Sequence, residues 1–198
     1  MKRVYVLVFD GYADWELGNV LAEVRRLGKA EVVSVGFTDD IVVSMGGLRV
    51  IPDMSLSRVE PGDVSLFILP GGYLWEQGYP TDELEPFLKG LEASGIPLAA
   101  ICAATTVLAR AGILRGRRHT SNSPAYLEKM VPEHIEPGFY VETLAVRDRQ
   151  VITASGLGAV EFTVQVLEEL ELSTPETRKI WFDAFKEGNF PDDFAHDM

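Results

Sequence analysis

Cysteine and histidine are scarce in this sequence. Its 198 residues include one cysteine and three histidines. A single cysteine excludes an intramolecular disulfide framework and indicates a reducing compartment, so we expect a cytoplasmic protein. These few residues offer no metal-ligand spacing, and Gly156-Leu157-Gly158 lacks the third glycine of a dinucleotide-binding fingerprint. We therefore expect neither a metal nor another cofactor.

Positive charge and long apolar runs are also lacking. The chain has 18 Lys and Arg against 30 Asp and Glu, which gives a formal net charge of −12 at pH 7. This balance argues against nucleic acid or an anionic membrane as the main partner. No apolar run approaches the length of a membrane span. The N-terminal segment has only a short apolar run and no small-residue cleavage site, so we interpret it as a strand and not as a signal peptide.

Apolar strand-like runs alternate with helical patterns, which is typical of a doubly wound, mostly parallel α/β sheet flanked by helices. We expect strands at 4–9, 31–37, 64–69, 144–146 and 151–154 and just before Cys102, with a small β-hairpin formed by 42–44 and 48–51. We expect helices at 14–27, 81–94, 123–131 and 160–172, after Cys102 as far as Gly112, and from 173 onward. No repeat or linker interrupts this pattern. It predicts one domain over residues 1–198, with 173–198 as a C-terminal helix and tail.

The single cysteine, Cys102, lies between an apolar stretch and a helix-forming stretch. A residue at a strand-to-helix turn is lifted out of the sheet on a tight bend, beside the unpaired N–H groups of the first helical turn. Those groups and the helix dipole favour negative charge, so we expect the thiol to lose its proton more readily than a free thiol. A lone cysteine is otherwise often a small, inert core residue. The strand-to-helix position favours the functional interpretation.

Three segments end at the carboxyl edge of the predicted sheet, where catalytic loops lie in this architecture. They are residues 10–16 after the first strand, Gly71-Gly72 after the strand at 64–69, and Cys102. Paired glycines let the backbone approach a substrate oxygen closely, so we expect Gly71, Gly72 and Ala103 to provide an oxyanion hole. The alternative for the two glycines is an ordinary tight turn. Glu16 either points inward over these loops or is a plain surface residue of its helix.

Four stretches, in this order, resemble the DJ-1/PfpI superfamily with its class I glutamine amidotransferase-like, flavodoxin-like fold. They are residues 11–16 (GYADWE), 69–72 (LPGG), 100–104 (AICAA) and 152–156 (ITASG). The resemblance implies that the carboxyl group of Glu16 is protonated and hydrogen-bonds the sulfur of Cys102. Such a contact would stabilise a thiolate and control its oxidation. The resemblance also implies oxyanion N–H donors at Gly72 and Ala103, and a homodimer.

The chain departs from that family at the histidine positions. Related members often carry a Thr-x-His sequence where this chain has Asn122 in the histidine place, and His119 lies three residues earlier. Peptidase-like relatives have a histidine directly after the cysteine, where this chain has Ala103, and the His-x-Glu pair of true glutaminases is missing. Side chains of an extended segment alternate, so His119 faces away if Asn122 faces the sulfur. His119 is a candidate general base, and Asn122 is a candidate to orient a substrate group or water.

Two functions are compatible with these residues. A thiolate with a paired carboxyl group and an oxyanion hole adds to electrophilic carbon, which predicts a cysteine-dependent small-molecule hydrolase or lyase of the amidase, hydratase or glyoxalase type. The alternative is a redox-sensing or stress-response protein whose cysteine is oxidised to a sulfenic or sulfinic acid without turnover. The partner is accordingly a small-molecule substrate or an oxidant. Exposed aromatic residues that are candidates to line a homodimer interface or the pocket are Trp75, Tyr79, Trp181, Phe190 and Phe194, although core packing is the simpler account of Trp181.

Overall fold

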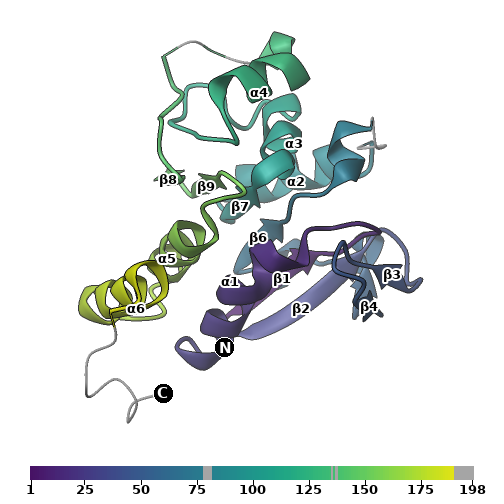
Figure 1. The fold of residues 1–198 in the computed structure, drawn as a ribbon. Helices are drawn as coiled ribbons and strands as arrows, with labels where there is room; N and C mark the ends of the chain where they lie inside the picture. Colours follow the sequence, from purple (N-terminus) through teal and green to yellow (C-terminus); the bar gives the residue numbers. More distant parts are fainter. Residues whose placement is uncertain (78–81, 135, 137, 190–198) are drawn as a thin grey trace.

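A central β-sheet organises the computed structural model, which describes residues 1–77, 82–134, 136 and 138–189 (Figure 1). Its seven strands are β1 (Arg3–Leu7), β2 (Glu31–Gly36), β5 (Met54–Ser55), β6 (Leu66–Leu69), β7 (Leu98–Ile101), β8 (Ala145–Asp148) and β9 (Val151–Ala154). They lie in the order β5-β2-β1-β6-β7-β9-β8, and all neighbours are parallel except β8 and β9. The prediction of a doubly wound, mostly parallel sheet is confirmed. So is the hairpin, formed by β3 (Val42–Val43) and β4 (Arg49–Val50).

Helices cover both faces of this sheet. They are α1 (Asp14–Arg26), α2 (Leu84–Ala93), α3 (Thr105–Arg110), α4 (Pro124–Met130), α5 (Ala159–Glu169) and α6 (Pro175–Glu187). Right-handed crossovers place α1 and α2 on opposite faces, because the chain moves in opposite directions across the sheet after β1 and β6. Helix α5 packs against α1, and α6 packs on α5. Short 3-10 turns are η1 (Leu56–Arg58), η2 (Pro61–Asp63), η3 (Tyr73–Glu76), η4 (Cys102–Ala104) and η5 (Pro132–His134). None of the helices in the described ranges is long and apolar enough to span a bilayer.

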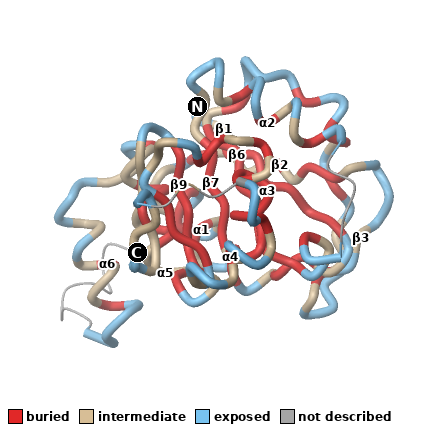
Figure 2. The backbone as a smooth tube through the Cα atoms, turned by 90° about the horizontal axis from the view of Figure 1, so that it is seen from above, coloured by how far each residue is buried: buried red, intermediate tan, exposed pale blue. Residues whose placement is uncertain are grey.

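The middle strands are buried on both faces, as Figure 2 shows. Every residue of β6, β7 and β9 is buried. A strand covered by helices on both faces reads as a continuous apolar run, which is why these segments were recognisable in the sequence. Helix α1 instead buries one face, with Leu17, Val20 and Val24. The sheet is therefore a rigid platform for the loops at its edge.

Element boundaries differ from the sequence predictions by a few residues. The strand predicted at 64–69 begins at Leu66, because the preceding turn η2 extends to Asp63. The helix predicted at 81–94 begins at Leu84, and Pro86 lies in its first turn, where its missing N–H costs no intrahelical bond. Thr81, with which the predicted helix begins, lies outside the described residues. The sequence analysis missed β5, whose two residues are too short to show a pattern.

One of the aromatic side chains predicted to lie on the surface is buried. Trp75 is fully buried, its indole N–H donates to the carbonyl of Pro70 at 2.8 Å, and its ring packs edge-to-face on Phe9. Its predicted exposure is therefore wrong, because the turn η3 directs it into the core. Trp181 is also buried and stacks on Phe185. The other three aromatics named for an interface are outside the described residues, and the homodimer stays a prediction.

Candidate active site

The sheet topology brings three loops together. Strands β1, β6 and β7 are consecutive neighbours and parallel, so the segments after their carboxyl ends share one edge of the sheet. The amide N–H of Ala13, after β1, donates to the carbonyl of Gly71, after β6, at 2.9 Å. The β3–β4 hairpin is joined to the same edge, because the side chain of Asp14 accepts hydrogen bonds from Ser44 and Gly46. The three loops predicted to converge therefore do so.

Cys102 occupies a strained turn directly after β7. Its φ angle is +61°, in the left-handed region that non-glycine residues rarely adopt. Such a residue costs about 1–3 kcal/mol and persists only where its surroundings fix it. The hydroxyl of Thr105 donates to the carbonyl of Cys102 at 2.7 Å, and a 2.7 Å contact joins Thr105 to Ser121. These bonds fix the turn, and the predicted tight bend at Cys102 is confirmed.

Glu16 points inward from the first turn of α1 and is fully buried. Its Oε2 accepts a hydrogen bond from the amide of Gly71 at 2.7 Å. Its Oε1 is buried, has no well-aligned hydrogen bond among the described residues, and belongs to a carboxyl group that interacts with the thiol of Cys102. The inward orientation predicted for Glu16 is confirmed, and the surface alternative is wrong.

Burial raises the pKa of both acidic groups, and the charge of Glu16 raises that of Cys102 further. Burial raises the pKa of Glu16 from 4.5 to about 7, although the amide of Gly71 and the thiol of Cys102 oppose this shift. Burial, and next the negative charge of Glu16, raise the pKa of Cys102 from 9.0 to about 11. Two negative charges in contact are unfavourable, so the pair keeps one proton between about pH 7 and 11.

The expectation of a lowered pKa for Cys102 is therefore wrong. Cys102 is the first residue of a three-residue 3-10 turn, and the helix that follows has only six residues, so the helix dipole at the sulfur is small. The amide of Asn122 and the N–H of Ala103 do lower the thiol pKa, but burial outweighs them. When the shared proton lies on Glu16, the repulsion disappears and the carboxyl O–H is a donor toward the sulfur. The charge of the pair, and not of the thiol alone, decides reactivity.

Asn122 faces the sulfur. Its side-chain amide Nδ2 donates to Sγ of Cys102 at 3.3 Å, and its Oδ1 accepts from the backbone N–H of Gly156 at 2.9 Å. The alternation of side chains in this extended segment then directs His119 to the opposite side, as predicted. Asn122 therefore has the orienting position that the sequence analysis considered for it.

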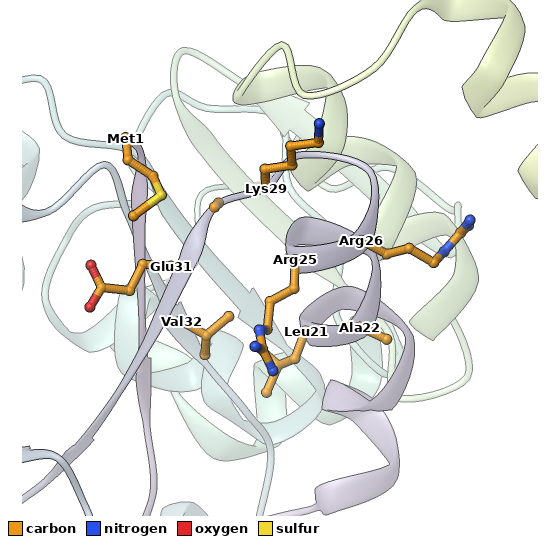
Figure 3. A pocket seen from close by; sticks show the side chains of 9 residues that line it. Met1, Leu21, Ala22, Arg25, Arg26, Lys29, Glu31 and Val32 are labelled. Carbon is orange, nitrogen blue, oxygen red and sulfur yellow. The ribbon is translucent and has the colours of Figure 1, made fainter. Parts of the chain in front are cut away.

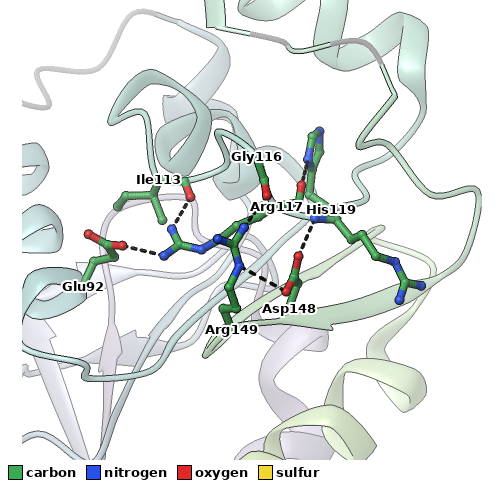
Figure 4. A network of polar contacts seen from close by, with 8 residues as sticks. Glu92, Ile113, Gly116, Arg117, His119, Asp148 and Arg149 are labelled. Atoms are coloured by element: carbon green, nitrogen blue, oxygen red, sulfur yellow. Dashed lines mark hydrogen bonds and ion pairs between the residues drawn. The ribbon is translucent and has the colours of Figure 1, made fainter.

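His119 is not placed to act as a base. It is buried, its Nδ1 lies 2.8 Å from the carbonyl oxygen of Arg117, and its ring packs edge-to-face on Tyr140. Figure 4 shows it within a polar network that includes Asp148 and Arg149. It does not line the pocket at Cys102. The candidate role of His119 as general base is therefore wrong, because the strand alternation gives Asn122 the side facing the sulfur.

We expect His119→Gln to leave the alkylation rate of Cys102 within about twofold of wild type. The same change removes a buried ring and its contact with Tyr140, which should lower the free energy of unfolding by about 1–3 kcal/mol. Iodoacetamide kinetics and urea unfolding measure the two effects. A tenfold slower alkylation of Cys102 in a folded variant would contradict this prediction and show that His119 affects the reactivity of the thiol.

The predicted oxyanion hole is partly supported. The amide of Gly71 is occupied by Glu16, so its prediction as an oxyanion donor is wrong. Gly72 and Ala103 both line the pocket that contains Cys102, and no backbone bond from the amide of Gly72 occurs in the part of the chain that the structure describes. The amide of Ala103 donates toward the sulfur of Cys102.

Two glycines provide the space in which the acid and the thiol meet. A Cβ atom on Gly71 would lie 2.8 Å from both Cβ of Cys102 and Oε2 of Glu16. A Cβ atom on Gly156 would lie 3.0 Å from Sγ of Cys102. Sequence reasoning placed Gly156 in a family stretch but not in the site. Only the packing shows that a side chain there would press on the sulfur.

The pocket above Cys102 is small, with a volume of about 190 Å³. It is lined by Ala13, Trp15, Glu16, Met45, Gly72, Tyr73, Glu76, Cys102 and Ala103. A hollow of about 360 Å³ lies beyond Asn122, toward Tyr140 and Leu157. A wider hollow of about 1000 Å³ lies near Met1, Arg25 and Glu31, at the amino edge of the strands and away from Cys102 (Figure 3). In the described part of the chain, no three His, Cys, Asp or Glu residues form a cluster able to hold a metal ion.

Sequence reasoning missed Glu76 and Tyr126. Glu76 follows the glycine pair in the turn η3, and Tyr126 lies on α4. The tyrosine hydroxyl donates to Oε1 of Glu76 at 2.9 Å. The two residues are 50 positions apart in the sequence, so no local sequence pattern predicts their contact. The pocket thus has a second carboxylate besides Glu16.

A cysteine on a strained strand-to-helix turn, paired with a buried glutamate at the carboxyl edge of a doubly wound sheet, defines an α/β protein of the nucleophile-elbow class. The chain belongs to the DJ-1/PfpI family, whose model matches residues 2–169. The resemblance inferred from the sequence is thus confirmed.

Known relatives cover most of the chain. It is 36% identical over 191 residues to the "Uncharacterized protease YoaZ" of Bacillus subtilis, which covers 91% of this chain and 89% of that protein. It is 31% identical over 119 residues to the "Deglycase PYRAB04690" of Pyrococcus abyssi, over 60% of this chain and 71% of that one. The crystal structure of the DJ-1 superfamily protein Atu0886 from Agrobacterium tumefaciens superimposes with a TM-score of 0.87 at 33% identity, covering 96% of this chain and 100% of that chain. A structure titled "Toxoplasma gondii DJ-1, oxidized" gives a TM-score of 0.76 at 26% identity, covering 93% of this chain and 97% of that chain.

Proposed function

We propose that this protein is a cysteine-dependent enzyme that acts on small electrophilic carbonyl compounds. The observation that carries the proposal is the pairing of Cys102, on its strained turn, with the buried carboxyl group of Glu16 beneath a pocket. A strained, fixed nucleophile beside an acid of near-neutral pKa is the arrangement that covalent catalysis needs. The pocket volume of about 190 Å³ is below the about 300–1,000 Å³ of sites for drug-sized ligands, so the substrate is small.

The first chemical step is addition of the sulfur to the carbonyl carbon. Sγ of Cys102 forms a bond to carbon, and the π electrons of the carbonyl move to its oxygen. Glu16 takes the thiol proton and returns it to that oxygen, which gives a neutral thiohemiacetal. The pocket-lining amide of Gly72 supports stabilisation of the oxygen while it carries negative charge.

The names of relatives fit this chemistry unequally. A deglycase acts on a small carbonyl-derived group, which agrees with the pocket size. A protease needs room for a peptide and a histidine that accepts the nucleophile's proton and then, as a general acid, gives it to the leaving amine, and His119 is directed elsewhere. The small-carbonyl assignment is therefore the one that the site supports best.

The test is consumption of methylglyoxal, a small dicarbonyl, by wild-type protein and by Cys102→Ser. We expect the serine variant to lose at least about a thousandfold in rate, because a hydroxyl is a far weaker acid and nucleophile than the thiol that it replaces. Covalent adducts on the wild-type protein are followed by intact mass. Equal consumption by both proteins, or no adduct and no turnover with either methylglyoxal or glyoxal, would contradict the proposal.

A second candidate function is oxidant sensing. The specific observation in its favour is the donor set at the sulfur, where the amides of Asn122 and Ala103 are placed to receive a sulfinate oxygen. One similar structure is described as oxidized. Peroxide treatment followed by mass analysis of Cys102 distinguishes the two functions, since a sensor gains oxygen at low peroxide and consumes no carbonyl compound.

A further inference from the structure

The walls of the Cys102 pocket carry only one sign of charge. Among the residues that the structure describes, its lining includes two carboxyl groups, Glu16 and Glu76, and no lysine, arginine or histidine. Two aromatic side chains stand at its mouth, with Trp15 56% exposed and Tyr73 61% exposed. Glu16 is occupied by its contacts with Gly71 and the thiol. Glu76 is therefore the carboxylate left to meet a ligand.

Tyr126 fixes the position of Glu76. Its hydroxyl donates to Oε1 at 2.9 Å, while no hydrogen bond or ion pair occupies Oε2 within the described ranges. Burial and the charge of Glu76 raise the pKa of Tyr126 above its ordinary value of 10.0, so the hydroxyl remains a donor at neutral pH. A thiolate at Cys102 raises the pKa of Tyr126 in the same direction. The charge of Arg110 acts on Tyr126 in the opposite direction, but Arg110 does not line the pocket.

A carboxylate beside two aromatic rings is the environment that recognises an ammonium group. The ring faces attract a cation, and the carboxylate supplies the opposite charge. The same arrangement repels a substrate that carries a carboxylate or a phosphate. The pocket thus selects by charge before the sulfur reacts.

The geometry points to Glu76, held by Tyr126, as the specificity-determining residue for a small electrophile that carries a primary or quaternary ammonium group. The ammonium group binds between the Oε2 atom of Glu76 and the rings of Trp15 and Tyr73, and its electrophilic centre lies over Cys102. This inference rests on the proposed function, because it assumes that the sulfur attacks a bound electrophile.

Charge-matched thiol reagents test the selection directly. We compare trimethylammonioethyl methanethiosulfonate with its sulfonatoethyl analogue, which has similar size and opposite charge. The sulfur attacks the divalent sulfur of the reagent, a disulfide bond forms, and methanesulfinate leaves. Because the chain has one cysteine, every label reports Cys102. Rates are divided by those of mercaptoethanol, a neutral thiol, to remove the intrinsic reactivity of each reagent.

We expect a normalised rate ratio of cationic to anionic reagent well above one for wild type, and about tenfold lower for Glu76→Gln. Tyr126→Phe should lower the ratio by a smaller factor, because Glu76 keeps its charge but loses its fixed position. Glu60→Gln is the matched control, since it removes an equal charge from an exposed residue just before η2, and should leave the ratio unchanged. Both key positions lie at or near the surface, so folding of the variants can be confirmed by circular dichroism.

The possible failures are distinguishable. A wild-type ratio near one, or a ratio that falls equally in Glu76→Gln and Glu60→Gln, overturns the charge selection while leaving Cys102 as nucleophile. Neutral methyl methanethiosulfonate tests the nucleophile separately. If it reacts with Cys102 no faster than with the urea-unfolded chain and no carbonyl compound is consumed, the proposed function itself fails, and the selection inference fails with it.

Discussion

Glu16→Gln is expected to slow carbonyl turnover by about two to four powers of ten, because an amide cannot move the proton between sulfur and oxygen. The side chain keeps its shape and its acceptor for the amide of Gly71. The ultraviolet absorbance of the thiolate reports the change. Wild type should show a last deprotonation near the pKa of about 11, whereas the variant should show one thiol transition at lower pH, since no carboxylate repels the thiolate.

The same substitution is expected to stabilise the protein at alkaline pH. Glu16 binds its proton more tightly in the folded protein, with a pKa of about 7, than in the unfolded chain, with a pKa near 4.5. Its contribution to stability is fully present below pH 4.5 and is lost as the pH rises through 7. Above pH 7 the loss amounts to about 3 kcal/mol, which the neutral amide avoids. Urea unfolding at pH 4 and pH 8 measures the difference.

Glu23→Gln is the matched control on the same helix. Glu23 is also buried, but its carboxylate is paired with Arg26 at 2.6 Å. Removing that charge leaves the arginine without its partner, so this variant should lose stability at pH 8 where Glu16→Gln gains it. Equal pH dependence of the two variants, or unchanged turnover in Glu16→Gln, contradicts the role assigned to Glu16.

Gly71→Ala is expected to separate the acid from the nucleophile. Its methyl group would lie 2.8 Å from both Cβ of Cys102 and Oε2 of Glu16, which are held in place by the turn and by the bond to the amide of Gly71. A misplacement of about 1 Å costs about a hundredfold in rate. Overpacking should also lower the free energy of unfolding by about 1–3 kcal/mol. Turnover of methylglyoxal and thermal unfolding check both effects.

Gly18→Ala, on the same helix as Glu16, controls for the added methyl group. Nothing lies within 4 Å of a Cβ atom at Gly18, and alanine is the better helix former. It should keep full activity and gain about 0.5–1 kcal/mol of stability. If Gly71→Ala behaves like Gly18→Ala, the close approach of Glu16 to Cys102 is not what the activity requires.

Much of the fold was predictable because its signals are local. The buried strands β6, β7 and β9 are short apolar runs, and the helix expected from residue 123 is α4, which Ser123 caps with its hydroxyl accepting from the amide of Tyr126 at 3.0 Å. The position of Cys102 on a tight turn was also predictable, because a buried strand precedes it and a helix follows it. The ends of elements were less predictable, since 3-10 turns such as η2 replace strand residues without changing the hydrophobic pattern.

The sequence by itself determined the parallel sheet and the turn that carries Cys102, because each depends on residues that are close along the chain, whereas the inward orientation of Glu16 was settled by its contact with Gly71, 55 positions away. Tertiary structure alone decided the charge state of the acid and thiol, since burial and contact between residues 86 positions apart set their pKa values. It also decided that the amide of Gly71 donates to Glu16 and is not free for an oxyanion, and that the hydroxyl of Tyr126 donates to Glu76 beside the pocket. Energies of this kind depend on desolvation and on distances across the fold, which no local pattern of residues encodes.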